Sequence, residues 1–153
     1  MTFHHRLACA LLAPVIGMSA AFAQDAQPAP QTGGAEVHGY PAAPLLSTGV
    51  TVLGEPIRYP TSGPAHVTAS IVTLLPGART VVHKHGVPMF AYILEGEITV
   101  DYGASGKRTY RKGDALMEAM DVAHFGENTG TQLMRLIAVY MGAKGADDVI
   151  PAK

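Results

Sequence analysis

The residues of this chain best suited to chemistry are histidines, two of which stand in the short sequence His83-Lys84-His85. This pair ends a β-type segment, and because successive side chains of a strand alternate faces, both imidazoles point the same way. Their Cα atoms are then roughly 6 to 7 Å apart, close enough for both rings to share one metal ion. His124 follows a second β-type segment and a loop, where antiparallel pairing can return it to the same cavity. The pattern predicts a metal site made of His83, His85 and His124.

Glycines frame the histidine pair at regular distances. Counting from Gly77, five residues lead to His83-x-His85, three more lead to Met89, and six more lead to Gly96. This spacing resembles the first motif of the cupin family, G-x5-H-x-H-x3-E-x6-G. Met89 stands where that motif usually has glutamate.

A second group of residues resembles the second cupin motif, G-x5-P-x-G-x2-H-x3-N. Gly113, His124 and Asn128 match this motif at the correct distances. Ala119 replaces its usual proline, and Asp121 replaces its usual glycine. We expect Asn128 to fix a turn near His124 by hydrogen bonding to backbone groups, as Asx side chains readily do.

The two half-motifs together, over about residues 65 to 142, are more specific than one H-x-H pair. The resemblance is to small single-domain bacterial cupins and implies a single-domain antiparallel β-barrel, the jelly-roll-like double-stranded β-helix. The residue pattern favours the same all-β class, because short β-type runs recur between Gly-rich turns without helical periodicity. The expected strands lie at 49–53, 66–75, 80–85, 90–94, 98–102, 107–111, 115–118 and 134–141.

Met89 is the departure from the motif with the largest chemical consequence. A glutamate would supply a hard anionic oxygen that suits Fe, Mn or Ni, whereas a thioether is soft, neutral and suited to copper. Met89 is therefore either an apolar wall or a fourth, copper-selective ligand; its common use as a gap-filler favours the wall. Three histidines plus water also describe a catalytic zinc site. The expected cofactor is one divalent transition metal: Fe, Cu, Mn, Ni or Zn.

Carboxylates near the histidine-bearing segments are candidates for proton transfer. Glu118 lies just before the loop of the second motif, and Glu97 and Glu127 flank the same segments. A carboxylate beside a metal cavity can act as a general base when burial raises its pKa towards neutrality. We take Glu118 as the candidate catalytic residue. Four tyrosines of the expected strands are candidates for the pocket wall: Tyr92, Tyr102, Tyr110 and Tyr140.

The first residues have the features of a secretory signal peptide. A short positive region precedes the mostly apolar run 7–20, and Ala21-Phe22-Ala23 is an A-x-A cleavage site. The apolar run is too short to span a bilayer comfortably. We expect cleavage after residue 23, a periplasmic or secreted protein, and no membrane attachment of the mature chain. Cys9, the single cysteine, lies within 1–23, which excludes cysteine ligands, nucleophiles and disulfides from the mature protein.

Composition completes the predicted organisation. Residues 24–44 are rich in Ala, Pro and Gln and form a flexible leader, residues 45–142 form the barrel, and residues 143–153 form a C-terminal tail. Charged residues are 15% of the chain and the formal net charge is -1, so no basic face for nucleic acid is indicated. Strand edges that the barrel leaves open would support a homodimer through strand addition.

Three classes of function follow from these features. The first is a metal-dependent enzyme that acts on a small molecule, of the dioxygenase, isomerase or lyase type. The second is a non-catalytic periplasmic module that binds a small ligand or a metal ion. The third is a structural role for the ion. An open coordination position distinguishes the first class from the others, and the fold alone does not choose among them.

Overall fold

β-strands make up nearly all the regular structure in a computed structural model of the protein, which describes residues 41–152. Within that range helical structure is limited to one 3-10 turn, and no helix is long and apolar enough to cross a membrane. The predicted all-β class is confirmed. The elements are β1 (Ala65–Leu74), β2 (His83–Lys84), β3 (Met89–Glu95), β4 (Glu97–Asp101), η1 (Gly103–Ser105), β5 (Lys107–Arg111), β6 (Ala115–Met117), β7 (Phe125–Glu127), β8 (Met134–Ala143) and β9 (Ile150–Pro151).

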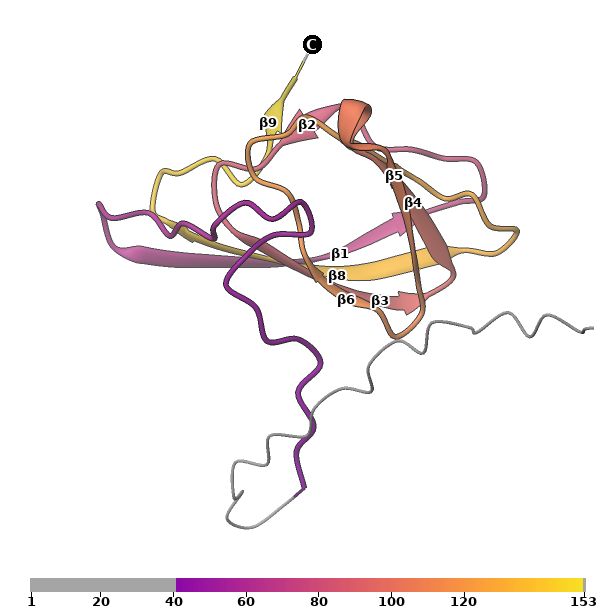
Figure 1. The fold of residues 1–153 in the computed structure, drawn as a ribbon, viewed down its shortest axis with the longest axis horizontal. Coiled ribbons are helices and arrows are strands. Elements are labelled where there is room, and N and C mark those ends of the chain that lie inside the picture. The colour runs from indigo at the N-terminus through magenta and orange to yellow at the C-terminus, as the bar shows by residue number, and fades with distance from the viewer. Residues whose placement is uncertain (1–40, 153) are drawn as a thin grey trace, which may run out of the picture. The chain divides into compact units, whose positions relative to one another are not determined.

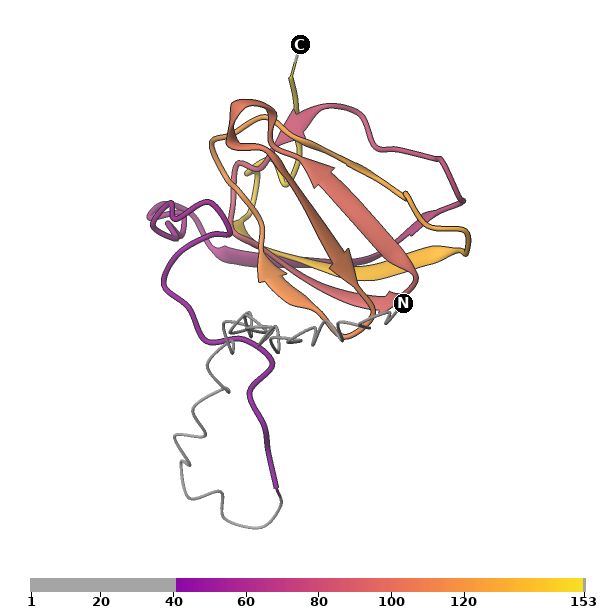
Figure 2. The ribbon, with the colours of Figure 1, turned by 45° about the vertical axis from the view of Figure 1, so that its right-hand side comes forward.

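The strands form antiparallel sheets in two main layers. A four-stranded sheet has the order β1-β8-β3-β6, and a three-stranded sheet has the order β5-β4-β7. The four-stranded sheet forms the lower layer in Figure 1, and β4 and β5 rise above one end of it. Figure 2 shows the same two layers after a turn that brings β4 and β5 towards the reader. A short sheet of β2 and β9 lies at the top of the molecule in Figure 1.

The described strands form separate antiparallel sheets rather than one continuous ring, so the predicted barrel is not closed. The stretch between β2 and β3 explains part of this interruption. Pro88 has no backbone N–H to donate to a ladder. Gly86 lies so close to the C-terminal segment that a Cβ there would be 2.6 Å from the Asp147 carbonyl oxygen. Isolated bridges, including one between His83 and His124, connect the layers where a full ladder would close a barrel.

The described strands differ from the predicted runs at both ends of the domain. Residues 49–53 make a single bridge, Val50 with Pro56, instead of a strand. The expected tail, residues 143–153, contributes β9, which pairs with β2. The expected signal peptide, residues 1–23, and residues 24–40 of the expected leader lie outside the described residues.

The turn between β3 and β4 depends on a glycine of the first motif. Gly96 has a positive φ of 72°, a conformation that L side chains rarely adopt. A Cβ at this position would also lie 2.5 Å from the Leu133 carbonyl oxygen. Any other residue would therefore push β8 away from β3 at this turn.

The hydrophobic core lies between the two main layers. Alternate residues of β8, among them Met134 and Ala138, are buried there, as is Ile93 of β3. Ile98 and Val100 of β4 pack against them from the facing layer. The core supports the inner surface on which the histidines lie.

Candidate metal centre

Backbone pairing brings the two motif histidine segments together. The N–H of His83 donates to the carbonyl oxygen of His124, and the N–H of His124 donates to that of His83, each at 2.9 Å. Two residues that exchange both bonds in this way lie directly opposite each other in an antiparallel pair, with their side chains on one face. The antiparallel return predicted for His124 is confirmed.

The three predicted histidines form one cluster. Each of His83, His85 and His124 has a ring nitrogen within 4.8 Å of those of the other two. The ring centroids are 4.7 Å apart for His83 and His124, 4.9 Å for His83 and His85, and 5.2 Å for His85 and His124. This arrangement fits a single transition metal ion.

Backbone carbonyls set the orientation of all three rings. A carbonyl oxygen can only accept, so each Nδ1 must carry a hydrogen, and Nε2 is left with the lone pair. Histidines that bind metals usually donate their second ring N–H in this manner. The acceptors are the carbonyl oxygens of Val81 for His83 (2.8 Å), Val122 for His124 (2.9 Å) and Asp148 for His85 (2.9 Å).

The electrostatics of the cluster favour neutral imidazoles. Burial lowers the pKa of His83, His85 and His124, and that of His85 falls to about 4. His85 is only 3% exposed, and its Nε2 is the one buried side-chain N or O atom in the described residues without a hydrogen-bond partner. An unpaired buried lone pair is costly, and a metal ion held with the two neighbouring imidazoles would satisfy it. The donor set therefore fits a divalent ion.

The cluster opens onto a small, mostly apolar cavity of about 80 Å³. This volume is well below the roughly 300 to 1,000 Å³ of pockets for drug-sized ligands, so only a small molecule fits. Val72, Ile98 and Leu136 contribute apolar walls. The polar and sulfur-containing groups that line it are His83, His85, His124, Thr80, Met89, Tyr110, Glu118 and Tyr140.

Glu118, the predicted catalytic residue, is buried at the wall of this cavity. Its Oε1 accepts hydrogen bonds from the Tyr102 hydroxyl and from the Ala119 backbone N–H, both at 2.8 Å. Burial is the largest influence on this carboxyl and raises its pKa. The Tyr102 hydroxyl also lies 3.1 Å from that of Tyr110, so it connects the carboxyl to a second tyrosine, which lines the cavity. The chain thus places a group able to hold a proton beside the imidazoles.

Met89 lines the same cavity, on the inner face of β3 with Ala91. Its side chain is 7% exposed. The carbonyl oxygen of Met89 accepts the backbone N–H of Glu118 at 2.9 Å, so β3 and the end of β6 meet at this point. The first motif lacks its usual glutamate, yet the neighbouring segment brings a carboxyl to the cavity.

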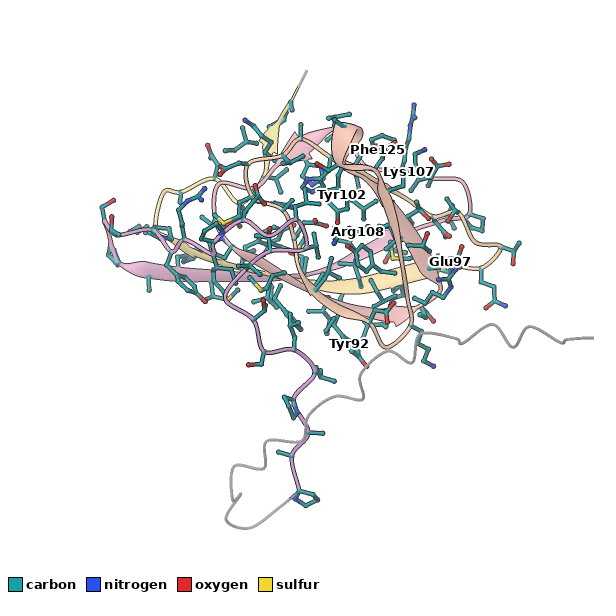
Figure 3. All side chains as sticks on the ribbon, in the orientation of Figure 1. Tyr92, Glu97, Tyr102, Lys107, Arg108 and Phe125 are labelled. Carbon is teal, nitrogen blue, oxygen red and sulfur yellow. The ribbon has the colours of Figure 1, made fainter. Side chains whose placement is uncertain are left out.

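The other sequence candidates divide between the inside and the outside of the molecule. Glu97 pairs with Arg111 and accepts a bond from a neighbouring threonine, away from the histidines. Figure 3 shows Tyr102 among the side chains between the layers and Tyr92 on the lower side of the four-stranded sheet. Neither Glu97 nor Glu127 lines the cavity.

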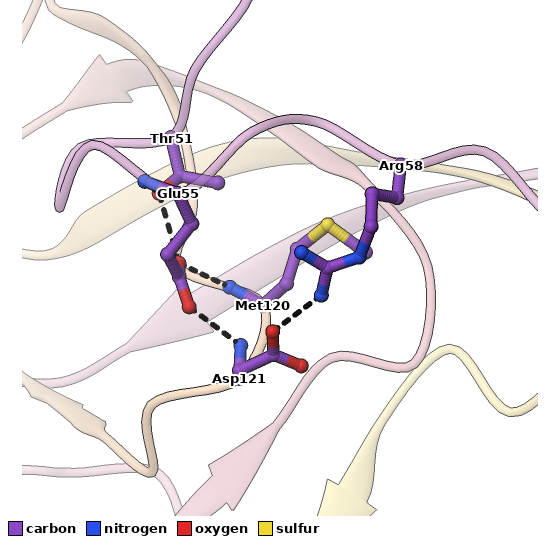
Figure 4. Close-up of polar contacts among 5 residues, drawn as sticks. All are labelled: Thr51, Glu55, Arg58, Met120 and Asp121. Carbon is purple, nitrogen blue, oxygen red and sulfur yellow. Dashed lines mark hydrogen bonds and ion pairs between the residues drawn. The ribbon is translucent and has the colours of Figure 1, made fainter.

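A carboxylate that the sequence analysis did not single out holds the loop between Glu118 and His124. The Glu55 carboxylate accepts the N–H of Met120 and the N–H of Asp121, both at 2.9 Å (Figure 4). The Met120 carbonyl in turn accepts the backbone N–H of His85 at 3.2 Å. Glu55 thus fastens a loop that contacts two of the candidate ligands. Its partners are distant in sequence, and no local pattern identifies it.

The Glu55 carboxylate and its bonds to the N–H groups of Met120 and Asp121 are here called the Glu55 clamp. Two further contacts support it. The Thr51 hydroxyl donates to the Glu55 carboxylate at 2.8 Å, and Thr51 is itself buried. Arg58 forms an ion pair with Asp121 on the exposed side of the loop (Figure 4). Asp121 occupies the motif position where a glycine is usual, so this ion pair is particular to the departure from the motif.

Residues 70–140 match the family model described as Cupin domain, and this match supports the cupin superfamily. Among solved structures, the polyketide cyclase RemF from Streptomyces resistomycificus has a TM-score of 0.50 and 18% identity, over 64% of this chain and 68% of the cyclase. At that identity the likeness concerns the fold alone.

Two other solved structures match with lower TM-scores. An oxalate decarboxylase from Lactobacillus farciminis has a TM-score of 0.47 and 23% identity, over 56% of this chain and 26% of that one. A sugar phosphate isomerase from Silicibacter pomeroyi has a TM-score of 0.43 and 23% identity, over 49% and 50% of the two chains. This chain thus covers half or less of these two proteins. The comparison with curated proteins found no match.

Proposed function

We propose that the protein is a periplasmic or secreted metal-dependent enzyme that acts on a small molecule. One divalent ion would bind to Nε2 of His83, His85 and His124. The observation that carries this proposal is the cluster of three imidazoles, two buried and that of His83 half-buried, whose Nδ1–H groups are all held by carbonyl oxygens, which leaves their Nε2 lone pairs free to bind one ion. The N-terminal sequence pattern supports the location outside the cytoplasm.

The cavity residues favour proton-transfer chemistry, of the isomerase or lyase type, over oxygenation. A bound divalent ion would supply Lewis-acid polarisation of a substrate oxygen. Glu118, whose pKa burial raises, can take a proton from the substrate or return it at the cavity wall. The Tyr102 hydroxyl keeps the carboxyl in place by donating to Oε1. The apolar walls exclude water from the substrate.

Met89 favours a second candidate, a non-catalytic module that binds copper. Its thioether lies in the wall of the cavity that the histidines share. Three imidazoles and a soft sulfur would suit copper better than a hard ion. A saturated, inert coordination sphere would distinguish this module from the enzyme.

The metal proposal is tested by metal analysis of protein purified from the periplasm without refolding. Alanine variants of His83, His85 and His124 should each lose metal stoichiometry while the domain stays folded, because two neutral ligands bind a divalent ion far more weakly than three. The matched control is His66→Ala, which removes an exposed histidine of β1 outside the cluster. Full metal retention in all three cluster variants would refute the site.

An open coordination position on the bound ion would distinguish an enzyme from a protein that only binds the ion. Small anions such as azide, added to the copper- or cobalt-loaded protein, should change its absorption spectrum if the ion keeps a free position. An unchanged spectrum would favour the binding module. N-terminal sequencing of the periplasmic protein tests the location, and a mature chain that begins at Gln24 is expected.

A further inference from the structure

The cavity beside the histidines is lined by no lysine and no arginine in the described part of the chain. Imidazoles that bind a metal are neutral. Glu118, the one carboxyl among the described lining residues, can only be neutral or negative. A bound ion would therefore be the single positive charge that this site offers to a substrate.

One arginine approaches the wall of the cavity from outside. Burial raises the pKa of Tyr110, and the neighbouring Arg108 opposes this effect. The Arg108 guanidinium donates to the Val52 carbonyl oxygen, and Arg108 is exposed and does not line the cavity. A second charged group on a substrate would therefore lie against apolar walls such as Ile98 and Leu136, with no counter-charge. Burying a charge without a partner is costly.

The size of the cavity limits the length of the substrate. The cavity has a volume of about 80 Å³. One water-sized group occupies roughly 10 to 15 Å³ on this scale, so the space holds roughly five to eight such groups. A bound ion and its remaining water would take part of that space. The substrate skeleton can then contain only a few carbon atoms.

One hydroxyl group at the cavity is free to hold a substrate. The hydroxyl of Thr80 is already engaged by two backbone groups, each at 3.1 Å, and that of Tyr110 lies against Tyr102. Within the described residues no hydrogen bond satisfies the Tyr140 hydroxyl, yet it is not one of their buried unpaired atoms. It therefore faces the open space of the cavity. The Tyr140 ring lies 5.6 Å from that of His85, so this donor is close to the candidate ligands.

We propose that the site takes a short, mostly apolar oxygen compound, such as a small ketone, aldehyde or hydroxy ketone, whose only charge, if it has one, is on the oxygen that binds the ion. A second oxygen would accept a hydrogen bond from the Tyr140 hydroxyl. Dicarboxylates and phosphate esters are excluded, because their further charge has no counter-charge in the cavity. This inference rests on the proposed function for the ion, but the cavity itself can be tested without metal.

The charge requirement is tested with three short ligands: butanone is neutral, butyrate has one charge and succinate has two. In the metal-free protein, butanone should shift the NMR signals of the Val72 and Leu136 methyl groups, which line the cavity, whereas the two anions should not. In the cobalt-loaded protein, butyrate should also bind and change the visible absorption spectrum. Succinate should have a dissociation constant at least about tenfold higher than butyrate, because its second carboxylate would be buried unpaired.

Tyr140→Phe tests the second contact in the cobalt-loaded protein. The variant should bind acetoin, a hydroxy ketone with two oxygens, roughly two- to tenfold more weakly than the parent does, which corresponds to one neutral hydrogen bond. Its affinity for butanone, which has one oxygen, should stay at the parent value. The matched control is Tyr92→Phe, which removes a hydroxyl outside the cavity and should leave both affinities unchanged. Circular dichroism checks that both variants are folded.

Failure of the metal site and failure of this inference give different results. A protein that takes up no cobalt would refute the proposed function, and the NMR titrations of the metal-free protein would still decide what the cavity accepts. Succinate that binds the cobalt-loaded protein as tightly as butyrate would overturn the proposed substrate class. So would butanone that shifts no cavity methyl signal. Acetoin affinity that Tyr140→Phe leaves unchanged would overturn the role of Tyr140.

Discussion

At the scale of single residues, Met89 is either a copper ligand or an apolar wall of the cavity, and the two alternatives predict different copper affinities. If Met89 ligates, Met89→Leu should lower copper affinity and change the optical spectrum, because leucine preserves volume but offers no donor. If Met89 is only a wall, copper affinity should stay at the parent value, since this swap costs under about 1.5 kcal/mol in stability. Titration with copper, read by competition with a chelator, makes the measurement.

The control for this prediction is Met134→Leu, which alters a fully buried methionine of β8 that does not line the cavity. It should leave copper affinity unchanged in either case. Equal affinities for the parent and both variants would sink the methionine-ligand hypothesis.

Glu118 carries a second prediction at this scale, which needs no substrate. Burial raises the pKa of its carboxyl, so ionisation at neutral pH costs the folded state free energy. Glu118→Gln keeps an oxygen that can accept from Tyr102 and removes the charge. The metal-free variant should gain roughly 1 kcal/mol in free energy of unfolding at pH 7, a size that is common for single stabilising substitutions. Thermal unfolding measures this gain.

The pH dependence of that gain identifies its cause. A carboxyl with a raised folded-state pKa loses its penalty progressively as the pH falls below that pKa, and the penalty is gone once the carboxyl of the unfolded chain is protonated as well. The difference between Glu118→Gln and the parent should therefore shrink as the pH falls below that folded pKa. A gain that is the same in acid and at neutral pH would point to packing rather than to charge.

At the scale of elements, the loop between β6 and β7 is held by a carboxylate from the N-terminal part of the domain. Glu55→Ala would leave the N–H groups of Met120 and Asp121 without their acceptor. Hydrogen bonds to charged groups are worth about 1.5 to 3 kcal/mol each, so a loss of at least that size in unfolding free energy is expected. Metal affinity should fall too, because this loop carries His124. Urea unfolding and metal titration measure the two effects.

Arg58→Ala serves as the control for the clamp. It removes an ion pair with Asp121 that is exposed on both sides, and such pairs contribute about 0 to 1 kcal/mol. It should therefore change stability and metal affinity little. If the Arg58 variant lost as much affinity as the Glu55 variant, the clamp would not act through the backbone contacts of Glu55.

At the scale of the whole molecule, the metal-free protein should lose stability in mild acid. The pKa of His85 is about 4 in the folded state, below its ordinary value of 6.5, because burial disfavours the charged ring. Between these two values the unfolded chain binds more protons than the folded one, so the free energy of unfolding falls as the pH is lowered. The loss from His85 reaches about 3 kcal/mol near pH 4, and His83 and His124 add to it.

Urea unfolding of the metal-free protein from pH 7.5 to 4 measures this dependence. Bound metal should raise stability at neutral pH and be released as acid protonates the imidazoles. His66→Ala serves as the control variant, since His66 is exposed and lies outside the cluster. A metal-free protein of constant stability across this range would contradict the burial of neutral imidazoles.

Short-range pattern in the sequence is sufficient for most of the strands and for the identity of the cluster. The β-type runs at residues 66–75 and 134–141 place β1 and β8 nearly at their observed bounds, because strand-forming residues and the turn residues between them are local signals. The H-x-H spacing puts His83 and His85 on one face for the same reason. Asn128 bonds the backbone of Leu74, Gln132 and Gly130, as expected of an Asx side chain in a turn.

Other features depend on which distant segments meet in space. The Glu55 clamp, the Asp148 carbonyl that orients His85 and the tyrosine that holds Glu118 join residues 16 to 66 positions apart. No local periodicity encodes such pairs, because they arise only when the layers pack. The same holds for the close approach of Gly86 to Asp147 in the C-terminal segment. Spacing thus determines which residues can bind a metal, whereas packing determines what orients them, how large the cavity is, and which carboxyl enters it.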